Sequence, residues 1–347
     1  MLIDIFARRY EGTTLREGFE DRDRRLLVQV TRILTEDVCP YPADAKEGSV
    51  ADTFWNPLHS RLSRELGLTE LAPEWVFWTS KWNGNEVQQS YKNNPLKRCE
   101  KWMLEPPARD ADRHIKERLS LVELAFRQRE EGITAMNADP IRNPDDPPLF
   151  VATTLRLPVP TNYGEQIRQM RVGVTEGFKR HVEELNVRFR QAGYSLHYHN
   201  GFIQAATDTV IQEFLETPFW ALVGDPRWRN VDTDMKEALD RRDSGGRDPA
   251  WYAARALESA VKITCDIKRW TTGNEKSAHN YIDHLAAKSH KFIDRWEADS
   301  LKAFFTHARN PLGHGPGSAE MPKLTSQQTQ WAIEFSMSWI KSLIRRL

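Results

Sequence analysis

One helix of this chain ends in the stretch Phe304-Phe305-Thr306-His307-Ala308-Arg309-Asn310-Pro311-Leu312-Gly313-His314-Gly315-Pro316-Gly317. Four apolar residues recur at helical spacing on the way into it: Leu301, Phe304, Phe305 and Ala308. This spacing predicts a helix over about 292–308 with one buried face. Because Pro311 disfavours helical geometry at the residue before it, the helix should end near Arg309, with His314 in the Gly/Pro turn that follows.

The same pattern predicts three further helices around this one, over about 250–270, 277–287 and 326–346. A polar turn, Asp243–Pro249, precedes the first of them. Because short connections favour antiparallel neighbours, the four helices should form an up-and-down bundle beginning near Pro249.

The remainder of the chain is predicted to be mainly helical. Apolar residues recur at helical spacing within four segments, 26–34, 58–68, 119–126 and 174–189, and the last of these lies in a helix expected between Met170 and Arg190. A helix is also expected over 211–222. Leu196–His199 and Phe202–Ala205 flank Asn200-Gly201, the strongest short hairpin signal. Trp75–Trp78 is consistent with a short buried strand or with the start of a helix, while the four prolines of Asn137–Pro148 predict a surface loop.

The composition fits a soluble protein of two domains, since a domain usually has about 100–200 residues and this chain has 347. Its 49 Lys+Arg balance its 49 Asp+Glu, so RNA binding would need a local basic patch. The three cysteines, Cys39, Cys99 and Cys265, lie far apart and favour a reducing compartment over a disulfide or zinc framework. With no signal peptide at Met1–Arg9 and no apolar span, we expect a cytoplasmic protein without a membrane partner.

Arg309 and His314 are the residues in this sequence that best suit catalysis. A guanidinium binds phosphate through a fork of donors, and an imidazole moves a proton near neutral pH. Together they could cleave RNA without a metal, the Arg stabilising the charged transition state and the His transferring the proton. The alternative is that Arg309 caps helix carbonyls and His314 is an ordinary loop residue.

Two more residues are candidates for supporting roles. Asn310 either orients Arg309 or binds phosphate, or it caps the turn. Glu258 and Lys262 have the i, i+4 spacing of a helix ion pair; the other reading places Glu258 in the cleft, where it tunes His314. His197 and His199 share a strand face, but no third metal ligand is visible nearby.

The Arg309 to His314 spacing resembles the R-x4-6-H signature of HEPN ribonucleases. Trp251–Lys262 resembles the first helix of abortive-infection C-terminal (Abi-C) domains, with the pattern A-x-x-A-L-E-S-x-x-K. Leu185–Arg190, with Gly193-Tyr194 and Asn200-Gly201 after it, is similar to the N-terminal half of AbiJ-like phage-defence proteins. The resemblance implies a mainly α fold: a helical N-terminal sensor or regulatory domain with a small β-hairpin over 1–225, then a HEPN four-helix bundle over 226–347.

The resemblance also implies a function. The protein would be a toxin-type endoribonuclease of antiphage defence, with Arg309, Asn310, His314 and Glu258 at its site and with no cofactor or metal. HEPN enzymes build one cleft from two copies, so a homodimer through the C-terminal domain is expected, with a partner protein that restrains or triggers it. Two alternatives are a non-catalytic HEPN scaffold that binds a nucleotide or a partner, and a nucleic-acid-binding regulator that uses the Trp-rich N-terminal half.

Overall fold

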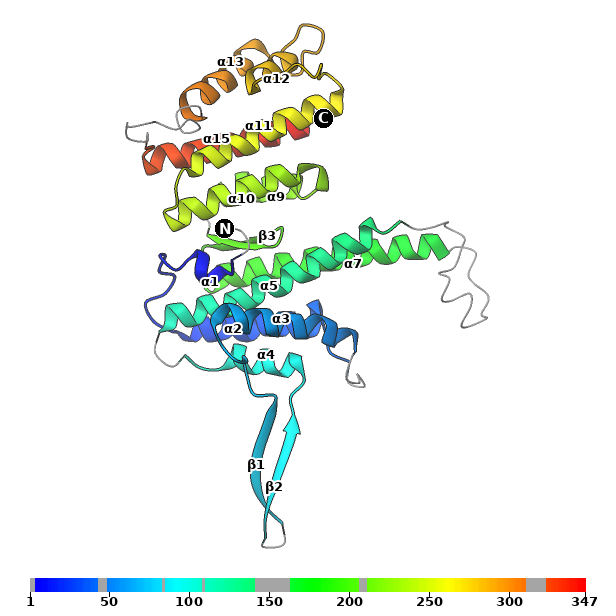
Figure 1. Cartoon of the computed structure of the whole chain (residues 1–347), viewed down its shortest axis with the longest axis vertical. Coiled ribbons are helices and arrows are strands. Elements are labelled where there is room, and N and C mark those ends of the chain that lie inside the picture. The colour runs from blue at the N-terminus through cyan, green and yellow to red at the C-terminus, as the bar shows by residue number, and fades with distance from the viewer. Residues whose placement is uncertain are drawn as a thin grey trace. The chain divides into compact units, whose positions relative to one another are not determined.

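The computed structural model describes residues 4–42, 49–82, 85–107, 110–140, 163–205, 211–309 and 323–347. Two compact units divide the chain. We call Ile5–Ala7 with Thr14–Ile203 the N-terminal unit, and Met1–Asp4, Arg8–Thr13 and Gln204–Leu347 the C-terminal unit. Figure 1 shows that helices dominate both units, as the sequence predicts.

The N-terminal unit consists of long helices and antiparallel hairpins. Its elements are α2 (Asp21–Arg32), η1 (Ile33–Val38), α3 (Val50–Leu66), β1 (Trp75–Trp82), β2 (Asn85–Lys92), α4 (Pro95–Leu104), α5 (Ala111–Ala138), α7 (Tyr163–Gln191) and β3 (Leu196–His199). Two short elements, α1 (Phe6–Arg9) and β4 (Phe202–Ala205), belong partly to this unit and partly to the C-terminal unit. Local signals set the limits of the helices: Ser49 caps α3 through the amide of Asp52, and Gly67 ends it in the left-handed conformation.

The β3–β4 hairpin confirms the small hairpin that Asn200-Gly201 predicts. Both turn residues have positive φ, 42° and 89°, as a two-residue hairpin turn requires. Arg127 of α5 donates from Nε to the carbonyl of Gly201 (2.7 Å), and Glu123 accepts from the amide of Ile203 (2.9 Å). Because Arg127 and Glu123 also pair at 2.9 Å, one buried ion pair holds the hairpin on α5.

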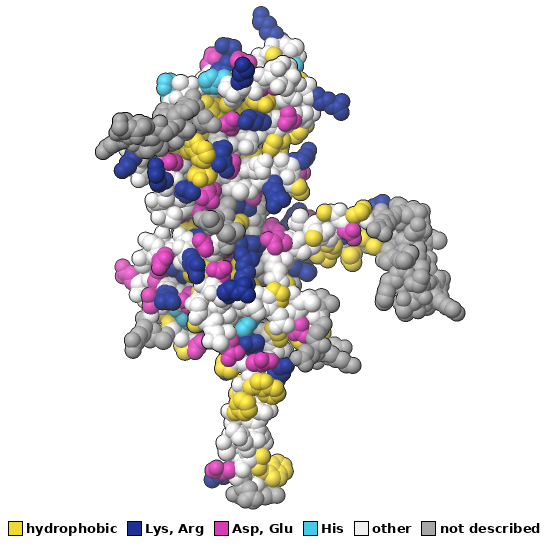
Figure 2. All heavy atoms as spheres, viewed as in Figure 1, with side chains coloured by type: hydrophobic (Ala, Val, Ile, Leu, Met, Phe, Trp, Pro, Cys, Tyr) yellow, Lys and Arg dark blue, Asp and Glu magenta, His cyan; other side chains and the backbone are white. Residues whose placement is uncertain are grey.

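A second hairpin, β1–β2, corrects the reading of Trp75–Trp78. This segment is a strand, but it is exposed rather than buried: Trp75 is 49% and Phe77 63% accessible. Figure 2 shows hydrophobic side chains along this hairpin, which projects beyond α4. Apolar and polar residues do not alternate along Trp75–Trp78, so the sequence pattern does not indicate whether either face of the strand is buried.

The helices of the N-terminal unit also extend further than expected. The structure continues α5 to Ala138, two residues into the predicted Asn137–Pro148 loop, and 141–148 lie outside the described residues. The helix α7 starts at Tyr163, before its predicted start at Met170. In both helices most of the added residues are exposed, so no buried apolar face marks them in the sequence.

The C-terminal unit is a stack of helices. Its elements are η2 (Gln212–Glu216), α9 (Thr217–Val223), η3 (Pro226–Trp228), α10 (Arg229–Ser244), α11 (Pro249–Lys268), α12 (Ala278–Leu285), α13 (Arg295–Phe304), η4 (Phe305–Arg309) and α15 (Ser326–Arg345). The last five cover the four ranges in which helices are predicted, with η4 continuing α13 as a π-helical turn. Helical packing alone does not distinguish a HEPN bundle from other bundles, so that assignment stays a prediction.

The central helix of the C-terminal unit is α11, which packs against α10 and α15 (Figure 1). Its inner face is made largely of small residues that are fully buried: Ala253, Ala254, Ala256, Leu257, Ala260 and Val261. Small side chains let neighbouring helices approach on more than one side, and Pro249 at the first turn fixes where α11 begins.

The helix α10 was not expected from the sequence. Four buried apolar residues hold it on the core, Val231, Met235, Ala238 and Leu239, and they recur at positions i, i+4, i+7 and i+8. Charged residues fill most of the remaining positions, which made this narrow stripe easy to miss. The helices of the C-terminal unit therefore begin well before Pro249.

Candidate active site at the end of η4

The predicted catalytic residues fall at the edge of what the structure describes. Arg309 is the last residue of η4, so its backbone lies at a helix end as predicted, while its side chain is outside the described part. Asn310 and His314 lie in 310–322, also outside it. Glu258 lies on α11 and is described. The proximity of Arg309 to His314 therefore stays a prediction.

Contacts at the start of α13 and at η4 itself hold this continuous helical segment in place. Asp294 and Glu297 form a capping box at the start of α13. Arg346, which follows α15, donates to Glu297 at 2.6 Å and so ties the end of α15 to the start of α13. Phe304 and Phe305 are buried, and η4 packs on α11. π-helical turns often occur at functional sites, and this one ends at Arg309.

Lys262, the ion-pair partner of Glu258, and η4 both lie close to the first half of α12. Glu258 pairs with Lys262 at 2.8 Å, as their spacing predicts, and its side chain is only 14% exposed. The Nζ of Lys262 lies 5.7 Å from the ring centre of Tyr281 on α12. The Thr306 hydroxyl of η4 lies 3.4 Å from Nε2 of His279, two residues before Tyr281.

A pocket of about 390 Å³ opens beside η4 and belongs wholly to the C-terminal unit. Its wall comes from α13, η4 and α15 and includes Phe304, His307, Gln328, Trp331 and Phe335. The Phe304 ring lies 4.6 Å from that of Phe335 and 5.8 Å from that of Trp331, centre to centre. Trp331 remains 52% exposed, so the pocket has a flat aromatic rim beside the helix end that carries Arg309.

This pocket was not expected from the sequence. Of the two tryptophans of α15, Trp331 lines the pocket and is exposed, whereas Trp339 is partly buried. The sequence does contain a sign of the α15 wall, because the i, i+4 spacing of Trp331 and Phe335 places both rings on one helix face. That α13 supplies the opposite wall could not be read from this spacing.

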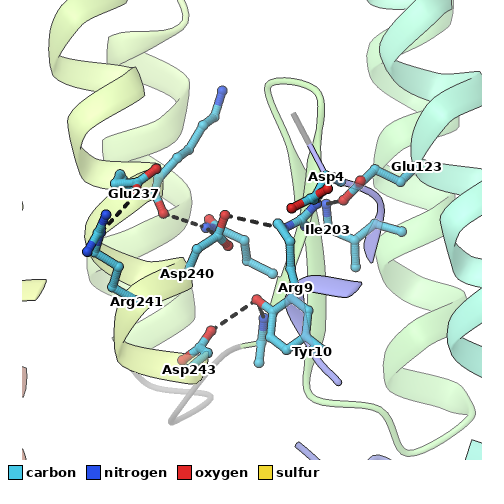
Figure 3. Close-up of polar contacts among 12 residues, drawn as sticks. Asp4, Arg9, Tyr10, Glu123, Ile203, Glu237, Asp240, Arg241 and Asp243 are labelled. Atoms are coloured by element: carbon cyan, nitrogen blue, oxygen red, sulfur yellow. Dashed lines mark hydrogen bonds and ion pairs between the residues drawn. The ribbon is translucent and has the colours of Figure 1, made fainter. Parts of the chain in front are cut away.

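A buried polar cluster also lies in the C-terminal unit, around the inner face of α10 (Figure 3). The Tyr10 hydroxyl donates to Asp243 at 3.0 Å, and Nε of Arg9 lies 3.2 Å from Asp240. Nε of Arg242 donates to Asp243 at 2.7 Å. Burial raises the pKa of Tyr10 well above its usual value and also raises the pKa of Asp243. The cluster fixes Arg8–Thr13 against α10, and no sequence period links residues more than 200 positions apart.

The described residues offer no evident metal centre. Across the described ranges, no three His, Cys, Asp or Glu side chains form a group that could hold a metal ion. The rings of His197 and His199 stack with their centres 5.9 Å apart, and burial lowers the pKa of His197 to about 4. None of the helices in the described part is both long and apolar enough to cross a bilayer.

Comparison with known families gives one match. The family described as AbiJ N-terminal domain 4 matches residues 4–221, which is more than half of the chain. No curated protein and no solved structure matches. The match ends within α9, so α10, α11 and the helices around η4 lie outside it.

Proposed function

Because this chain belongs to the AbiJ N-terminal domain 4 family, which gives it a role in abortive infection, we propose that it is a defence effector that cuts RNA in its C-terminal unit. The observation that carries the proposal is the position of Arg309, the last residue of a π-helical turn beside an open pocket. The segment after it supplies Asn310 and His314. The N-terminal unit would regulate the effector, and a partner protein would restrain or trigger it.

The chemistry follows from the groups that the site has. His314 takes the proton of the ribose 2′-hydroxyl while the 2′-oxygen forms a bond to phosphorus. The bond from phosphorus to the 5′-oxygen then breaks, and that oxygen receives a proton. Arg309 stabilises the extra negative charge on the phosphoryl oxygens in the transition state. The products are a 2′,3′-cyclic phosphate and a 5′-hydroxyl, and DNA is not cut because it lacks the nucleophile.

One Arg/His pair supplies too few groups for this reaction. The base and the acid act on opposite sides of the phosphorus, so two imidazoles serve better than one. We therefore propose that the C-terminal unit forms a homodimer in which two copies of the Arg309/His314 turn share one cleft. The exposed Trp331 is available as an anchor for this contact, because large half-exposed aromatics are typical interface residues.

The test is RNA cleavage by the full chain, as wild type and as Arg309→Ala and His314→Ala. Each change should lower cleavage by about a hundredfold or more, the usual loss when a group that stabilises the transition-state charge is removed. Arg295→Ala is the matched control, since Arg295 is an exposed arginine of the preceding helix α13. Growth of an expressing bacterial host and the integrity of its RNA would be followed in parallel.

Three outcomes would contradict the mechanism. Activity that depends on added Mg²⁺ would exclude transesterification by side chains alone. Wild-type activity in His314→Ala would remove the proposed base, and full activity in a strictly monomeric protein would remove the shared cleft. If the triggered protein binds a nucleotide or a partner in its apolar pocket but cuts no RNA, the scaffold reading replaces this one.

A further inference from the structure

The β1–β2 hairpin exposes aromatic rings and two strand edges. Trp82 is 70%, Phe77 63% and Tyr91 48% accessible, values unusual for such large apolar side chains. Within the described residues these strands form a two-stranded sheet, and no third strand pairs with either. An isolated two-stranded hairpin is marginally stable in water, so this one would gain from another strand.

The backbone register shows which groups the open edge of β2 presents. The Asn93 amide donates to the Glu74 carbonyl at 2.7 Å, which makes this a hydrogen-bonded pair of the ladder. Hydrogen-bonded pairs alternate along an antiparallel ladder, so Tyr91, Gln89 and Val87 also bond towards β1. The residues between them therefore direct their amide and carbonyl groups outward; these are Glu86, Gln88, Ser90 and Lys92.

The charges on this edge are self-complementary. Glu86 and Lys92 lie three residues on either side of Gln89, and β2 has no other charged residue. We propose that β2 pairs antiparallel with β2 of a second copy of this chain, about a twofold axis at Gln89. Glu86 of each copy then lies opposite Lys92 of the other, and Gln88 lies opposite Ser90. All four belong to the outward-directed set, so in this register their backbone groups point towards the second copy.

The side chains of the other face support the same register. Val87 of one copy falls opposite Tyr91 of the other, an aliphatic–aromatic pair of the kind that stabilises sheets. The Val87 and Tyr91 side chains are 40% and 48% exposed, so both have apolar surface to bury. The opposite edge fits self-pairing less well, because β1 carries a single charge, Lys81, with no acid to oppose it. The β2 edge is thus the one whose charges and backbone agree.

Crosslinking tests this geometry directly. In the proposed sheet the two Gln89 residues face each other as a non-hydrogen-bonded pair with Cα atoms about 4.5 Å apart, within reach of a disulfide. Thr79→Cys is the matched control: Thr79 is likewise exposed but lies on β1, about three strand spacings or roughly 14 Å from its counterpart. Under mild oxidation, full-length Gln89→Cys should form at least tenfold more covalent dimer than Thr79→Cys or wild type.

Charge reversal tests the register. In the Gln89→Cys background, Glu86→Lys places Lys against Lys92 of the second copy, and Lys92→Glu places Glu against Glu86. Each variant alone should lose about fivefold or more of the crosslink. Mixing the two should restore it to within about twofold, because both contacts then pair a Lys with a Glu. Within each hairpin, the substitutions also alter contacts with Lys81 and Glu74, and mixing does not change these contacts. Recovery of the crosslink on mixing therefore reports only the contact between copies.

The proposal fails if Gln89→Cys does not crosslink above Thr79→Cys, or if mixing restores nothing. If the thiol of the Gln89→Cys variant captures a host protein in place of a second copy, the edge belongs to a foreign strand and the proposal is also refuted. The result is independent of RNA cleavage, since the hairpin belongs to the N-terminal unit and the proposed ribonuclease site to the C-terminal unit.

Discussion

Glu216→Gln should stabilise the C-terminal unit at neutral and alkaline pH. Glu216, the last residue of η2, is 5% exposed. Burial raises the pKa of Glu216 to about 7, because the effect of burial is larger than the opposing attraction of Arg242. The nearby carboxylates of Asp243 and Glu334 raise this pKa further. The folded state therefore favours the protonated Glu216 carboxyl. At pH 8 Glu216 is ionised, and its buried negative charge destabilises the folded state.

The shift sets the magnitude. The folded pKa of about 7 stands some 2.5 above the ordinary value of 4.5. At about 1.4 kcal/mol per unit, this corresponds to an upper bound of roughly 3 kcal/mol. The folded state binds more protons than the unfolded state between pH 4.5 and 7, so this contribution is fully present below pH 4.5 and is lost as pH rises through 7. Glutamine carries no charge and should abolish this pH dependence.

The assay is urea unfolding of wild type and Glu216→Gln at pH 5 and at pH 8. Because other groups titrate over the same range, the informative quantity is the difference in unfolding free energy between the two proteins at each pH. It should favour the variant by up to about 3 kcal/mol at pH 8 and shrink towards zero at pH 5. Asp266→Asn, an exposed acid of α11, controls for the loss of one negative charge.

One result would refute this reasoning. If Glu216→Gln is less stable than wild type at pH 8, the attraction of Arg242 outweighs burial and the carboxylate is a favourable buried ion. A difference that does not change between pH 5 and pH 8 would show that Glu216 does not titrate in this range.

Three further predictions concern the core, the candidate site and acid stability. Leu257→Ala, at a fully buried position of α11, should cost about 2–5 kcal/mol in urea unfolding, whereas Ile267→Ala, 40% exposed on the same helix, should cost well under half of that. Asn310→Ala should lower RNA cleavage less than Arg309→Ala, because Asn310 supports the arginine at most; an equal loss would make it a direct participant. Burial lowers the pKa of His197 to about 4, so wild type should lose stability as pH falls from 6.5 towards 4, and His197→Gln should reduce that loss in unfolding measured at pH 7 and pH 5.

Local signals in the sequence were enough for most helices and for one turn. The stripe that ends before Pro311 predicts a helix over about 292–308, and α13 with η4 occupies 295–309. Asn200-Gly201 predicts the β3–β4 turn because it needs two residues at positive φ, which few residue types tolerate. Such signals act within a few residues, so their effect does not depend on contacts with the rest of the chain.

The tertiary structure decided what depends on distant neighbours. Whether Trp75–Trp78 is buried or exposed depends on what packs against it, and the local sequence does not contain that information. The charged positions of α10 find partners such as Arg9 for Asp240, more than 200 residues away, which turns a polar segment into a buried one. The pocket beside η4 likewise needs α13 and α15 side by side.

Some features of the candidate site follow from local sequence, and others depend on the tertiary structure. The sequence by itself determined that Arg309 ends a helix, and it named Glu258 as the partner of Lys262, because helix ends and i, i+4 pairs are properties of one segment. The tertiary structure decided that Lys262, the partner of Glu258, and η4 contact the same half of α12, and that an aromatic pocket opens beside η4. A burial pattern along one segment cannot carry such information, because the contacts that fix it are made by other segments.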